Sequence, residues 1–521
     1  MTKQNLILKL FFPIVVVASI LGISCKKYIY QGPITSTYGA EFWTSQQSVE
    51  QATAAMYGQL RADFVTADNS SPGLFFLAGD YVSGSFFNAS RQDYRPLTAS
   101  RNPFGTGPFN FNYAPYNHGM HDWSRFYQLI AQCNLILQNV PDMPTSLFGS
   151  ENKKNAYLGE ALFMKSFTYF YIIRIWGDPV FVEKTYNGAD YGNIAPIARS
   201  PEADVLDSCI SYLTKATSYL EYTAGDPSKS IRANKGSALA LLAHIYAWKH
   251  DYANAHKTCL ELINNGGYSL EPMSSYKNIW AGEFSSESIF EISMLFNPTD
   301  PNFKGQGAWA EARFDFFATF LKGPIINNLR SQSWVSPYDF IQNLYDTTND
   351  ARFKTILSFV PPSGSDEIGY MLEKYTNFKY AEPGTETSPY INNNLVVFRL
   401  SDIILLDAEA LASTGDLAGA AADLAQTENR AGISSYSNPT NQFEMLNEII
   451  DERGRELIGE GQWYFDLIRT EPAIGRLVLY GYPRDRVTPA NKGYYWPLDM
   501  PLLFPQDNLL TQNPWWASHT L

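Results

Sequence analysis

Two stretches far apart in the chain share one pattern of residues. The first is LLAHIYAWKHDYANA, which starts at Leu241, and the second is LLDAEALASTGDLAGA, which starts at Leu405. In each stretch an apolar run ends in a short polar turn, KHD or TGD. Small residues lie at matching distances from the aspartate. Before it, Ala247 matches Ala412, and after it, Ala253 matches Ala418 and Ala255 matches Ala420. The pattern predicts two helical hairpins whose helices cross at the small residues.

Three earlier segments also have helical periodicity. Residues 41–62 place apolar side chains at successive spacings of seven, three, four and four, which is one face of a helix. Residues 123–140 repeat this pattern, and residues 155–176 are apolar on nearly every side, which predicts a deeply buried helix. Paired helices of this kind look like tetratricopeptide units, which stack to share a core that no single unit can bury. The predicted fold is therefore mainly α, a scaffold of helical hairpins.

Two long excursions interrupt the helical blocks, at about residues 63–120 and 266–394. Both are crowded with Phe, Tyr, Trp, Asn and Gly, and both have few helix signals. Loops of this length inside a compact domain are uncommon and are usually functional. We expect irregular structure here, with few short strands.

The N-terminus has the features of an export signal. Residues 10–23 form a mostly apolar run after a basic start, too short for a bilayer span but typical of a secretory signal peptide. The small residues Gly22 and Ser24 precede Cys25, with Ser24 directly before it. This arrangement resembles the lipobox of bacterial lipoproteins. An ordinary signal peptide with an incidental cysteine is the alternative. We predict a signal peptide over residues 1–24 and an acylated Cys25 that anchors the chain to a membrane.

Composition argues against several classes of protein. The net charge is −13, and no run of Lys or Arg is longer than two residues, as at Lys26 and Lys27, so we expect no nucleic acid partner. Cys133, Cys209 and Cys259 are odd in number and lack metal-site spacing, which favours buried free thiols over a disulfide framework.

The sequence contains none of the common catalytic or nucleotide-binding fingerprints. His118, His121 and Asp122 lie close together, but no metal motif surrounds them, and a junction between a loop and a helix is the simpler interpretation. We predict no catalytic residues, no metal site and no cofactor.

Several charged residues lie in segments that we expect to be buried. Asp451 and Glu452 begin DERGRELIGEGQWYFDLIR, where opposite charges at helical spacing predict a structural ion-pair network rather than a catalytic pair. Glu160, Arg174 and Asp178 are expected to be paired charges within the core.

The aromatic residues of the excursions suggest a ligand site. Sugar rings expose C–H faces that stack on aromatic planes, while Asn and Arg side chains hydrogen-bond to hydroxyl groups. The candidate ligand contacts are Phe86, Phe87, Asn88, Arg91 and Tyr94 in the first excursion and Trp309 and Trp334 in the second. The alternative is that these rings form a satellite core that pins the loops to the scaffold.

Six segments, spread over the whole chain after Cys25, together resemble the SusD/RagB family of Bacteroidetes outer-membrane lipoproteins. In chain order they are KYIYQGPITSTYGAEFWTSQQSVEQATAAMYGQLR, WSRFYQLIAQCNLILQNV, YLGEALFMKSFTYFYIIRIWGDPVF, FRLSDIILLDAEALASTGD, ERGRELIGEGQWYFDLIR and YYWPLDMPLLFPQDNLLTQNPWW. The resemblance implies one SusD-like domain over residues 25–521, built on about four tetratricopeptide-like hairpins with a loop-rich face.

The resemblance also implies a function. Family members are nutrient-binding, non-catalytic partners of SusC-like TonB-dependent transporters in the outer membrane, and they most often bind glycans. A peptide-binding member would use the same aromatic loops and stays open as an alternative. The rival from another class is a lipid-anchored glycosidase, for which Asp93 and Asp315 are the candidate carboxylates.

Overall fold

The computed structural model describes residues 41–65, 73–87, 120–185, 195–222, 226, 230–294, 317, 319–321, 334–361, 368–380, 389–505 and 507–519. The predicted signal peptide and Cys25 lie outside these residues. Within them, no helix combines the length and the apolar composition that crossing a membrane requires.

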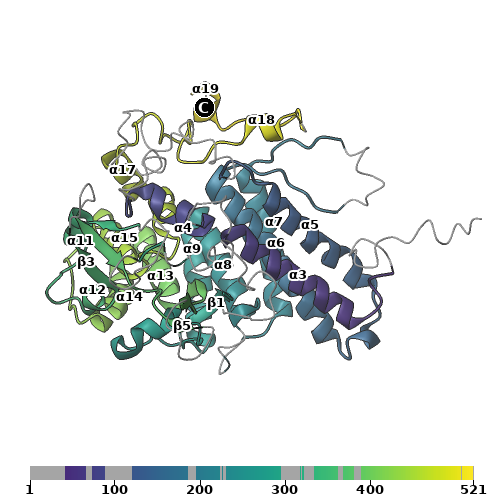
Figure 1. Cartoon of the computed structure of the whole chain (residues 1–521), viewed down its shortest axis with the longest axis horizontal. Helices are drawn as coiled ribbons and strands as arrows, with labels where there is room; N and C mark the ends of the chain where they lie inside the picture. Colours follow the sequence, from purple (N-terminus) through teal and green to yellow (C-terminus); the bar gives the residue numbers. More distant parts are fainter. Residues whose placement is uncertain are drawn as a thin grey trace, which may run out of the picture.

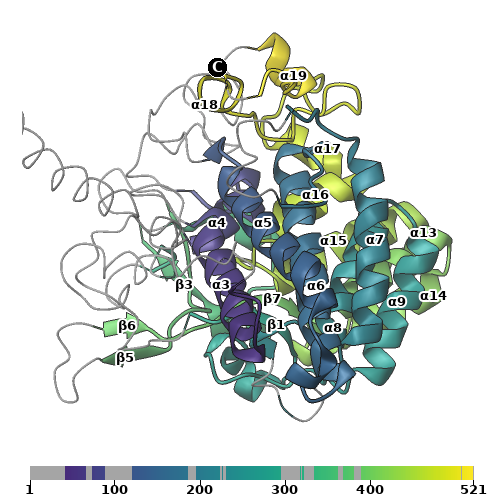
Figure 2. The same ribbon diagram turned by 90° about the vertical axis from the view of Figure 1, so that its right-hand side faces the viewer.

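Helices arranged in four pairs form the scaffold of the described chain, and each pair packs against the next (Figures 1 and 2). The pairs are α3 (Gln46–Val65) with α5 (Ser124–Asn139), α6 (Glu151–Trp176) with α7 (Glu202–Tyr219), α8 (Lys235–Trp248) with α9 (Tyr252–Asn265), and α13 (Leu400–Thr414) with α14 (Leu417–Arg430). A further helix, α15 (Gln442–Glu456), packs on the last pair. The predicted mainly α, tetratricopeptide-like hairpin scaffold is confirmed.

The two matching sequence stretches form the hairpins α8–α9 and α13–α14, and their turns have the same geometry. Asp251 and Asp416 each accept a hydrogen bond at the start of the second helix, from the backbone N–H of the residue three positions on. The residue before each aspartate has a positive φ, 58° at His250 and 93° at Gly415. Glycine adopts this backbone conformation freely, whereas a histidine there is strained.

The alanines of the two hairpins are buried in the same pattern. Ala255 and Ala420 are buried at the crossing of each helix pair, whereas Ala253 and Ala418 are exposed. Small residues therefore face the crossing because bulkier side chains would hold the helices apart.

Helix α6 runs through the middle of the scaffold, where it contacts α3, α5, α7 and α8. Every residue from Tyr157 to Trp176 is buried, as its uniformly apolar sequence predicts. The helix ends at Gly177, where φ is +77° and a Cβ atom would lie 2.8 Å from the ring of Tyr495.

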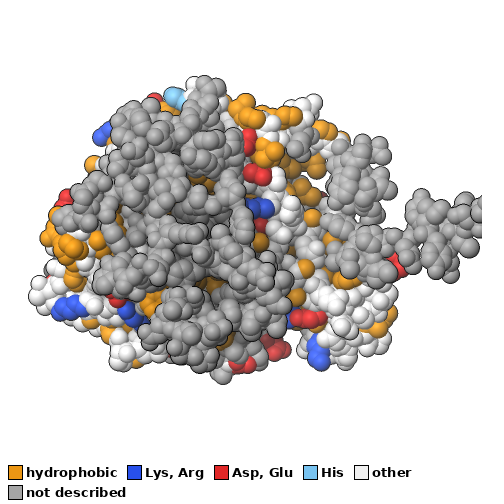
Figure 3. Space-filling view, viewed as in Figure 1, with side chains coloured by type: hydrophobic (Ala, Val, Ile, Leu, Met, Phe, Trp, Pro, Cys, Tyr) orange, Lys and Arg blue, Asp and Glu red, His pale blue; other side chains and the backbone are white. Residues whose placement is uncertain are grey.

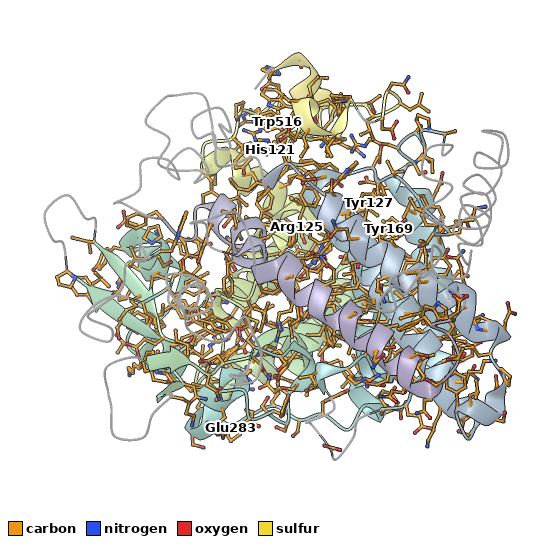
Figure 4. All side chains as sticks on the ribbon, turned by 45° about the vertical axis from the view of Figure 1, so that its right-hand side comes forward. His121, Arg125, Tyr127, Tyr169, Glu283 and Trp516 are labelled. Carbon is orange, nitrogen blue, oxygen red and sulfur yellow. The ribbon has the colours of Figure 1, made fainter. Side chains whose placement is uncertain are left out.

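Two tyrosines hold the extended segment that follows α6. The hydroxyl of Tyr127 on α5 accepts a hydrogen bond from the Val180 N–H at 2.7 Å, and the hydroxyl of Tyr169 on α6 accepts one from the Val182 N–H at 2.7 Å. Figure 4 shows the two tyrosines side by side on adjacent helices. The hydroxyl groups of two buried tyrosines thus provide hydrogen-bond acceptors for backbone N–H groups of this extended segment.

The three cysteines on the described helices are buried and free, as predicted. Cys133 lies on α5, Cys209 on α7 and Cys259 on α9. Burial raises the pKa of each thiol, because the thiolate form loses its hydration. These thiols are therefore core side chains rather than reactive groups.

The second excursion leaves the scaffold between α9 and α13 and returns beside its starting point. Strand β1 (Ser288–Ile292) pairs antiparallel with β7 (Leu395–Arg399) and closes the base of the excursion, so that α9 and α13 still contact each other. The excursion also contains a three-stranded sheet, in the order β2 (Ser336–Pro337), β4 (Gly369–Leu372), β3 (Leu357–Val360), and the hairpin β5 (Phe378–Tyr380) with β6 (Pro389–Ile391). The expected short strands are confirmed.

Short helices accompany these strands, and the sequence pattern did not predict them. They are the 3₁₀ helix η10 (Met273–Trp280), α11 (Tyr338–Leu344) and α12 (Ala351–Ile356) in the second excursion, and α4 (Leu74–Gly79) with the 3₁₀ turn η1 (Tyr81–Ser83) in the first. Their periodicity is undetectable in the sequence, because most are shorter than two helical turns.

A buried carboxylate, Glu456 at the end of α15, joins three separate parts of the chain. It accepts hydrogen bonds from Arg399 at the end of β7 at 2.6 Å, from Arg352 on α12 at 2.9 Å, and from Arg430 on α14. These four side chains are almost completely inaccessible to solvent. The three guanidinium groups hold the pKa of the Glu456 carboxyl well below its usual range, against the effect of burial.

Neighbouring charges extend this network. Glu452 lies 2.6 Å from Arg352 and 2.7 Å from Arg455, and Glu460 lies 2.8 Å from Arg399 and 2.5 Å from Lys374. The predicted structural role of the charges at residues 451–460 is therefore confirmed.

The charges near α6 agree with the prediction only in part. Glu160 is paired as predicted, with Arg232 at 2.7 Å. Arg174 instead lies against three aromatic rings, with its guanidinium carbon 4.1 Å from the ring centre of Tyr171 and 4.2 Å from that of Phe465. Cation–π contacts thus replace the expected carboxylate partner, because the neighbouring turns of α6 and α16 (Trp463–Arg469) present rings there.

We expect Glu456→Gln to lower the free energy of unfolding by about 3–5 kcal/mol, because it removes the carboxylate that compensates buried guanidinium groups. Equilibrium unfolding in urea measures the change. Asp451→Asn is a matched control on the same helix, since Asp451 forms a partly exposed pair with Arg476, and it should cost less than about 1 kcal/mol. Equal losses in the two variants would contradict the role assigned to Glu456.

Strand β1 carries a second buried carboxylate, Glu291, whose partners are neutral. It accepts hydrogen bonds from the Asn394 amide at 2.7 Å and from the Ser288 hydroxyl. Burial raises the pKa of Glu291 from 4.5 to about 7. The folded state therefore binds this proton more tightly than the unfolded state does. The resulting stabilisation is complete below about pH 4.5 and is lost as the pH rises through 7.

A Glu291→Gln variant cannot lose that proton, so its stability relative to the wild type should depend on pH. Between pH 5 and pH 8 we expect the variant to gain up to about 3 kcal/mol over the wild type, from a shift of this size in pKa. Urea unfolding across this pH range measures the difference. Glu283→Gln, a change at an exposed carboxylate of the same excursion, is the control. A constant difference between wild type and Glu291→Gln would contradict the prediction.

Candidate functional site

The two excursions meet at a pair of backbone hydrogen bonds. The Phe87 N–H donates to the Val335 carbonyl at 2.9 Å, and the Val335 N–H donates to the Phe87 carbonyl at 3.0 Å. The Ser336 hydroxyl adds a bond to the Ser85 carbonyl at 2.7 Å. The described parts of the two excursions are therefore held together at Phe87 and Val335.

Aromatic rings pack around this junction. The ring of Trp334 stacks on that of Tyr81 with 4.1 Å between centroids and an interplanar angle of 2°. Phe86 packs edge-on against Tyr81 at 5.6 Å and contacts Phe320 at 5.1 Å. A stacked pair with edge-to-face neighbours is a favourable arrangement for buried rings. This aromatic junction (Tyr81, Phe86, Phe320 and Trp334) therefore holds the two excursions together.

The structure describes three of the seven predicted ligand contacts. Phe86, Phe87 and Trp334 are 0%, 2% and 1% exposed, so their faces lie against other side chains rather than solvent. This geometry is the one expected of rings that pin the loops, and binding of a ligand by these three residues stays a prediction. The other predicted contacts, Asn88, Arg91, Tyr94 and Trp309, lie outside the described residues.

A glycine turn joins this junction to the charge network. A Cβ on Gly79 would lie 2.1 Å from the Gly461 carbonyl oxygen, so the two backbones touch there. Gly459 and Gly461 both have φ of +71°. The Gly461 N–H donates to the Asp80 carboxylate at 2.7 Å, and the Tyr375 hydroxyl donates to the Gly459 carbonyl at 2.7 Å. The GEG sequence of this turn is required because only glycine permits both the positive φ and the contact.

The buried carboxylates beside the junction are not poised for catalysis. Burial raises the pKa of Asp80 to about 8, so this side chain is mostly protonated at neutral pH. Asp80 is completely buried, and the glycine turn covers it. The carboxylates proposed for the glycosidase alternative, Asp93 and Asp315, lie outside the described residues.

The histidine cluster lies at a junction between a loop and a helix, as expected. Asp122 accepts a hydrogen bond from the Ser124 N–H at 2.8 Å, where α5 begins, and His121 is buried beside it. His118 lies outside the described residues. In the described part of the chain, no group of three or more His, Cys, Asp or Glu side chains is arranged to hold a metal ion.

Sequence reasoning did not single out two exposed rings of the second excursion. Tyr338 is 40% exposed and Phe359 is 52% exposed, and the two rings lie 6.3 Å apart. They belong to strands and helices too short to produce a periodic signal. These two rings differ from the other aromatic residues of the excursions because the folded sheet brings them together at the surface.

Two family models match the chain. One is the SusD family, over residues 360–516, and the other is described as starch-binding associating with outer membrane, over residues 106–247. Together they span more than half of the chain. The chain belongs to the SusD/RagB family.

A curated SusD-like relative, protein P38 of Formosa agariphila, is 24% identical over 518 residues, which cover 92% of this chain and 93% of the relative. Solved SusD structures have the same fold. A SusD superfamily protein from Bacteroides thetaiotaomicron has 21% identity and a TM-score of 0.70, with 91% of this chain and 99% of that chain covered. Surface glycan-binding protein A from the same species was solved in complex with laminarihexaose. It has 21% identity and a TM-score of 0.68, with 90% of this chain and 100% of that chain covered.

The burial of Trp334 leads to a prediction that separates stability from binding. We expect Trp334→Ala to lower the free energy of unfolding by about 3–5 kcal/mol, because it removes a buried indole stacked on Tyr81. Urea unfolding measures the loss. Phe443→Ala is the control, since Phe443 is 63% exposed on α15, and its effect should stay within about 0.5 kcal/mol. An unchanged free energy of unfolding in Trp334→Ala would contradict the structural role assigned to this ring.

Proposed function

We propose that this protein captures an oligosaccharide at the outer membrane, without cleaving it, and delivers it to a SusC-like TonB-dependent transporter. The anchor in this proposal is the acylated Cys25, and the protein faces the outside of the cell. The ligand face is formed by the two excursions, which meet at the aromatic junction.

The observation that carries the proposal is the structural likeness to a protein solved with laminarihexaose bound, which extends over 90% of this chain. The family model over residues 106–247, described as starch-binding and associated with the outer membrane, supports the same ligand class and location. The transporter partner and the lipid anchor come from the resemblance of the sequence to the SusD/RagB family.

The charges of the scaffold also favour capture over catalysis. A glycosidase requires two carboxyl groups about 5–10 Å apart that reach the substrate. The buried carboxylates of α15 and its following turn, Glu452, Glu456 and Glu460, are each paired with arginine or lysine instead. Those groups hold the fold together and are closed to a substrate.

Calorimetry on the chain from residue 26 onward tests the proposal. The ligands are laminarihexaose, maltohexaose and xylohexaose, with a mixture of pentapeptides as the second class. Glucose is the control that shows whether a single sugar unit is enough for binding. We expect saturable binding of at least one hexasaccharide, weaker binding of glucose, and an unchanged chromatogram of the recovered sugar.

Each other outcome points to a different conclusion. Binding of peptides alone would overturn the glycan class while keeping the family. Shortened oligosaccharides in the recovered sample would establish the glycosidase. Failure to bind either class would contradict nutrient capture by these ligands.

A further inference from the structure

Three aromatic residues form a row across the small sheet of the second excursion. Tyr370 on the central strand β4 pairs directly with Phe359 on β3 and with Ser336 on β2, two residues before Tyr338. The ring of Tyr338 is nearly parallel to that of Tyr370, at 5.9 Å and 15°. Phe359 stands almost perpendicular to Tyr338, at 6.3 Å and 79°. The two outer rings therefore form a corner with Tyr370 beneath it.

The outer rings are open to solvent, although the ring beneath them is buried. Phe359 and Tyr338 are about half exposed, and Ile368 beside them is also exposed, whereas Tyr370 is buried. Figure 3 shows hydrophobic side chains gathered at the edge of the molecule where Figure 1 places β3 and α11. Isolated exposed apolar residues are normal on a protein surface, but a contiguous group indicates a contact site.

The backbone under the rings is tightly packed, so the rings are held in place before any ligand arrives. A Cβ on Gly369 would lie 2.6 Å from the Ser336 carbonyl oxygen, which means that β2 and β4 approach closely. The Tyr338 N–H donates to the Ile368 carbonyl, and the Gln342 amide donates to the Tyr370 hydroxyl at 2.7 Å. A rigid aromatic surface loses little conformational entropy when it binds.

The size of this surface decides between two kinds of partner. A large aromatic side chain covers about 150–250 Å², so two half-exposed rings and their neighbour offer roughly 300 Å². A stable protein–protein interface requires about 800 Å² on each partner. The surface is thus too small for a protein partner but large enough for one sugar ring, whose flat face can stack on one of the two perpendicular rings while its edge meets the other.

Polar groups at the margin fit the same ligand. Asp339 is exposed next to Tyr338, and Gln342 lies one helical turn further along α11 with its carbonyl oxygen not used in the bond to Tyr370. Both groups accept hydrogen bonds from hydroxyls. An aromatic plane with acceptors at its edge is the arrangement that binds a neutral sugar.

We propose that Tyr338 and Phe359 form a stacking platform for one sugar ring of the captured oligosaccharide. The inference rests on the glycan capture proposed above. It deepens that proposal, because it assigns a ligand-binding role to two residues that the sequence did not single out. The position suits this role. Val335, which pairs with Phe87 at the junction of the two excursions, lies only three residues before Tyr338.

The double variant Tyr338→Ala/Phe359→Ala tests the platform. In calorimetry against laminarihexaose, maltohexaose and xylohexaose, we expect the Kd of the oligosaccharide that binds the wild type to rise about tenfold. The matched control is Phe443→Ala, which removes an exposed phenyl ring from α15 and should leave the Kd unchanged. Thermal unfolding of all three proteins shows whether the fold is intact, and we expect similar melting temperatures because the removed rings are exposed.

The outcomes separate this inference from the proposal on which it rests. If the wild type binds a hexasaccharide and the double variant binds it equally well, the platform is wrong and glycan capture stands. If the wild type binds none of the three, glycan capture of this kind fails and the platform fails with it. A large drop in melting temperature would direct the test to the single variant Phe359→Leu, which keeps apolar bulk but removes the ring. In that variant an unchanged Kd would overturn the stacking role of Phe359.

Discussion

The carboxylate of Glu456 is the contact on which the arrangement of the rest depends. It lies at the end of α15 and binds guanidinium groups from α12, β7 and α14, which are elements of the second excursion and of the last helix pair. Removing such charges from water costs several kcal/mol for each ion, and a single pair seldom recovers that cost. Here Arg352 and Arg399 each meet more than one carboxylate, so the charge of each guanidinium group is compensated more than once. The placement of the second excursion against α15 makes these pairs possible.

The same network reaches the candidate ligand face. Glu460 binds Lys374 and Arg399 and is the middle residue of the turn whose Gly461 contacts Gly79 and bonds to Asp80. Asp80 directly precedes Tyr81, on which Trp334 of the other excursion stacks. A continuous chain of ion pairs, backbone contacts and stacked rings thus connects the helical scaffold to the point where the two excursions meet. The described residues at this point are therefore packed as tightly as the core.

The scaffold could be predicted from the sequence because helix periodicity is a local property. The matching alanines of α8–α9 and α13–α14, the apolar length of α6 and the helical setting of the three cysteines all appear in short windows of sequence. The mixed charges after Asp451 likewise indicated a network, although its partners Arg352 and Lys374 could not be identified. Those partners come from the second excursion, and only the folded chain brings them to α15.

The aromatic residues of the excursions show the limit of such reasoning. Phe86 and Phe359 have the same side chain, and both lie in segments where a ligand-binding ring was expected. Phe86 is buried because Tyr81 and Phe320 surround it, whereas Phe359 lies on an edge strand with its ring toward solvent. Composition identified the excursions as rich in aromatic residues, but the burial of each ring depends on pairings between distant segments.

The energy of the exposed ring gives a reason for its position. About 100 Å² of phenyl surface left in water forgoes about 2.5 kcal/mol that burial would provide. For Phe86 that free energy already contributes to folding. For Phe359 it is still available, and a sugar ring that covers the phenyl face recovers part of it. An exposed ring on a rigid sheet is therefore better suited to binding a ligand than a ring that is already buried in the folded protein.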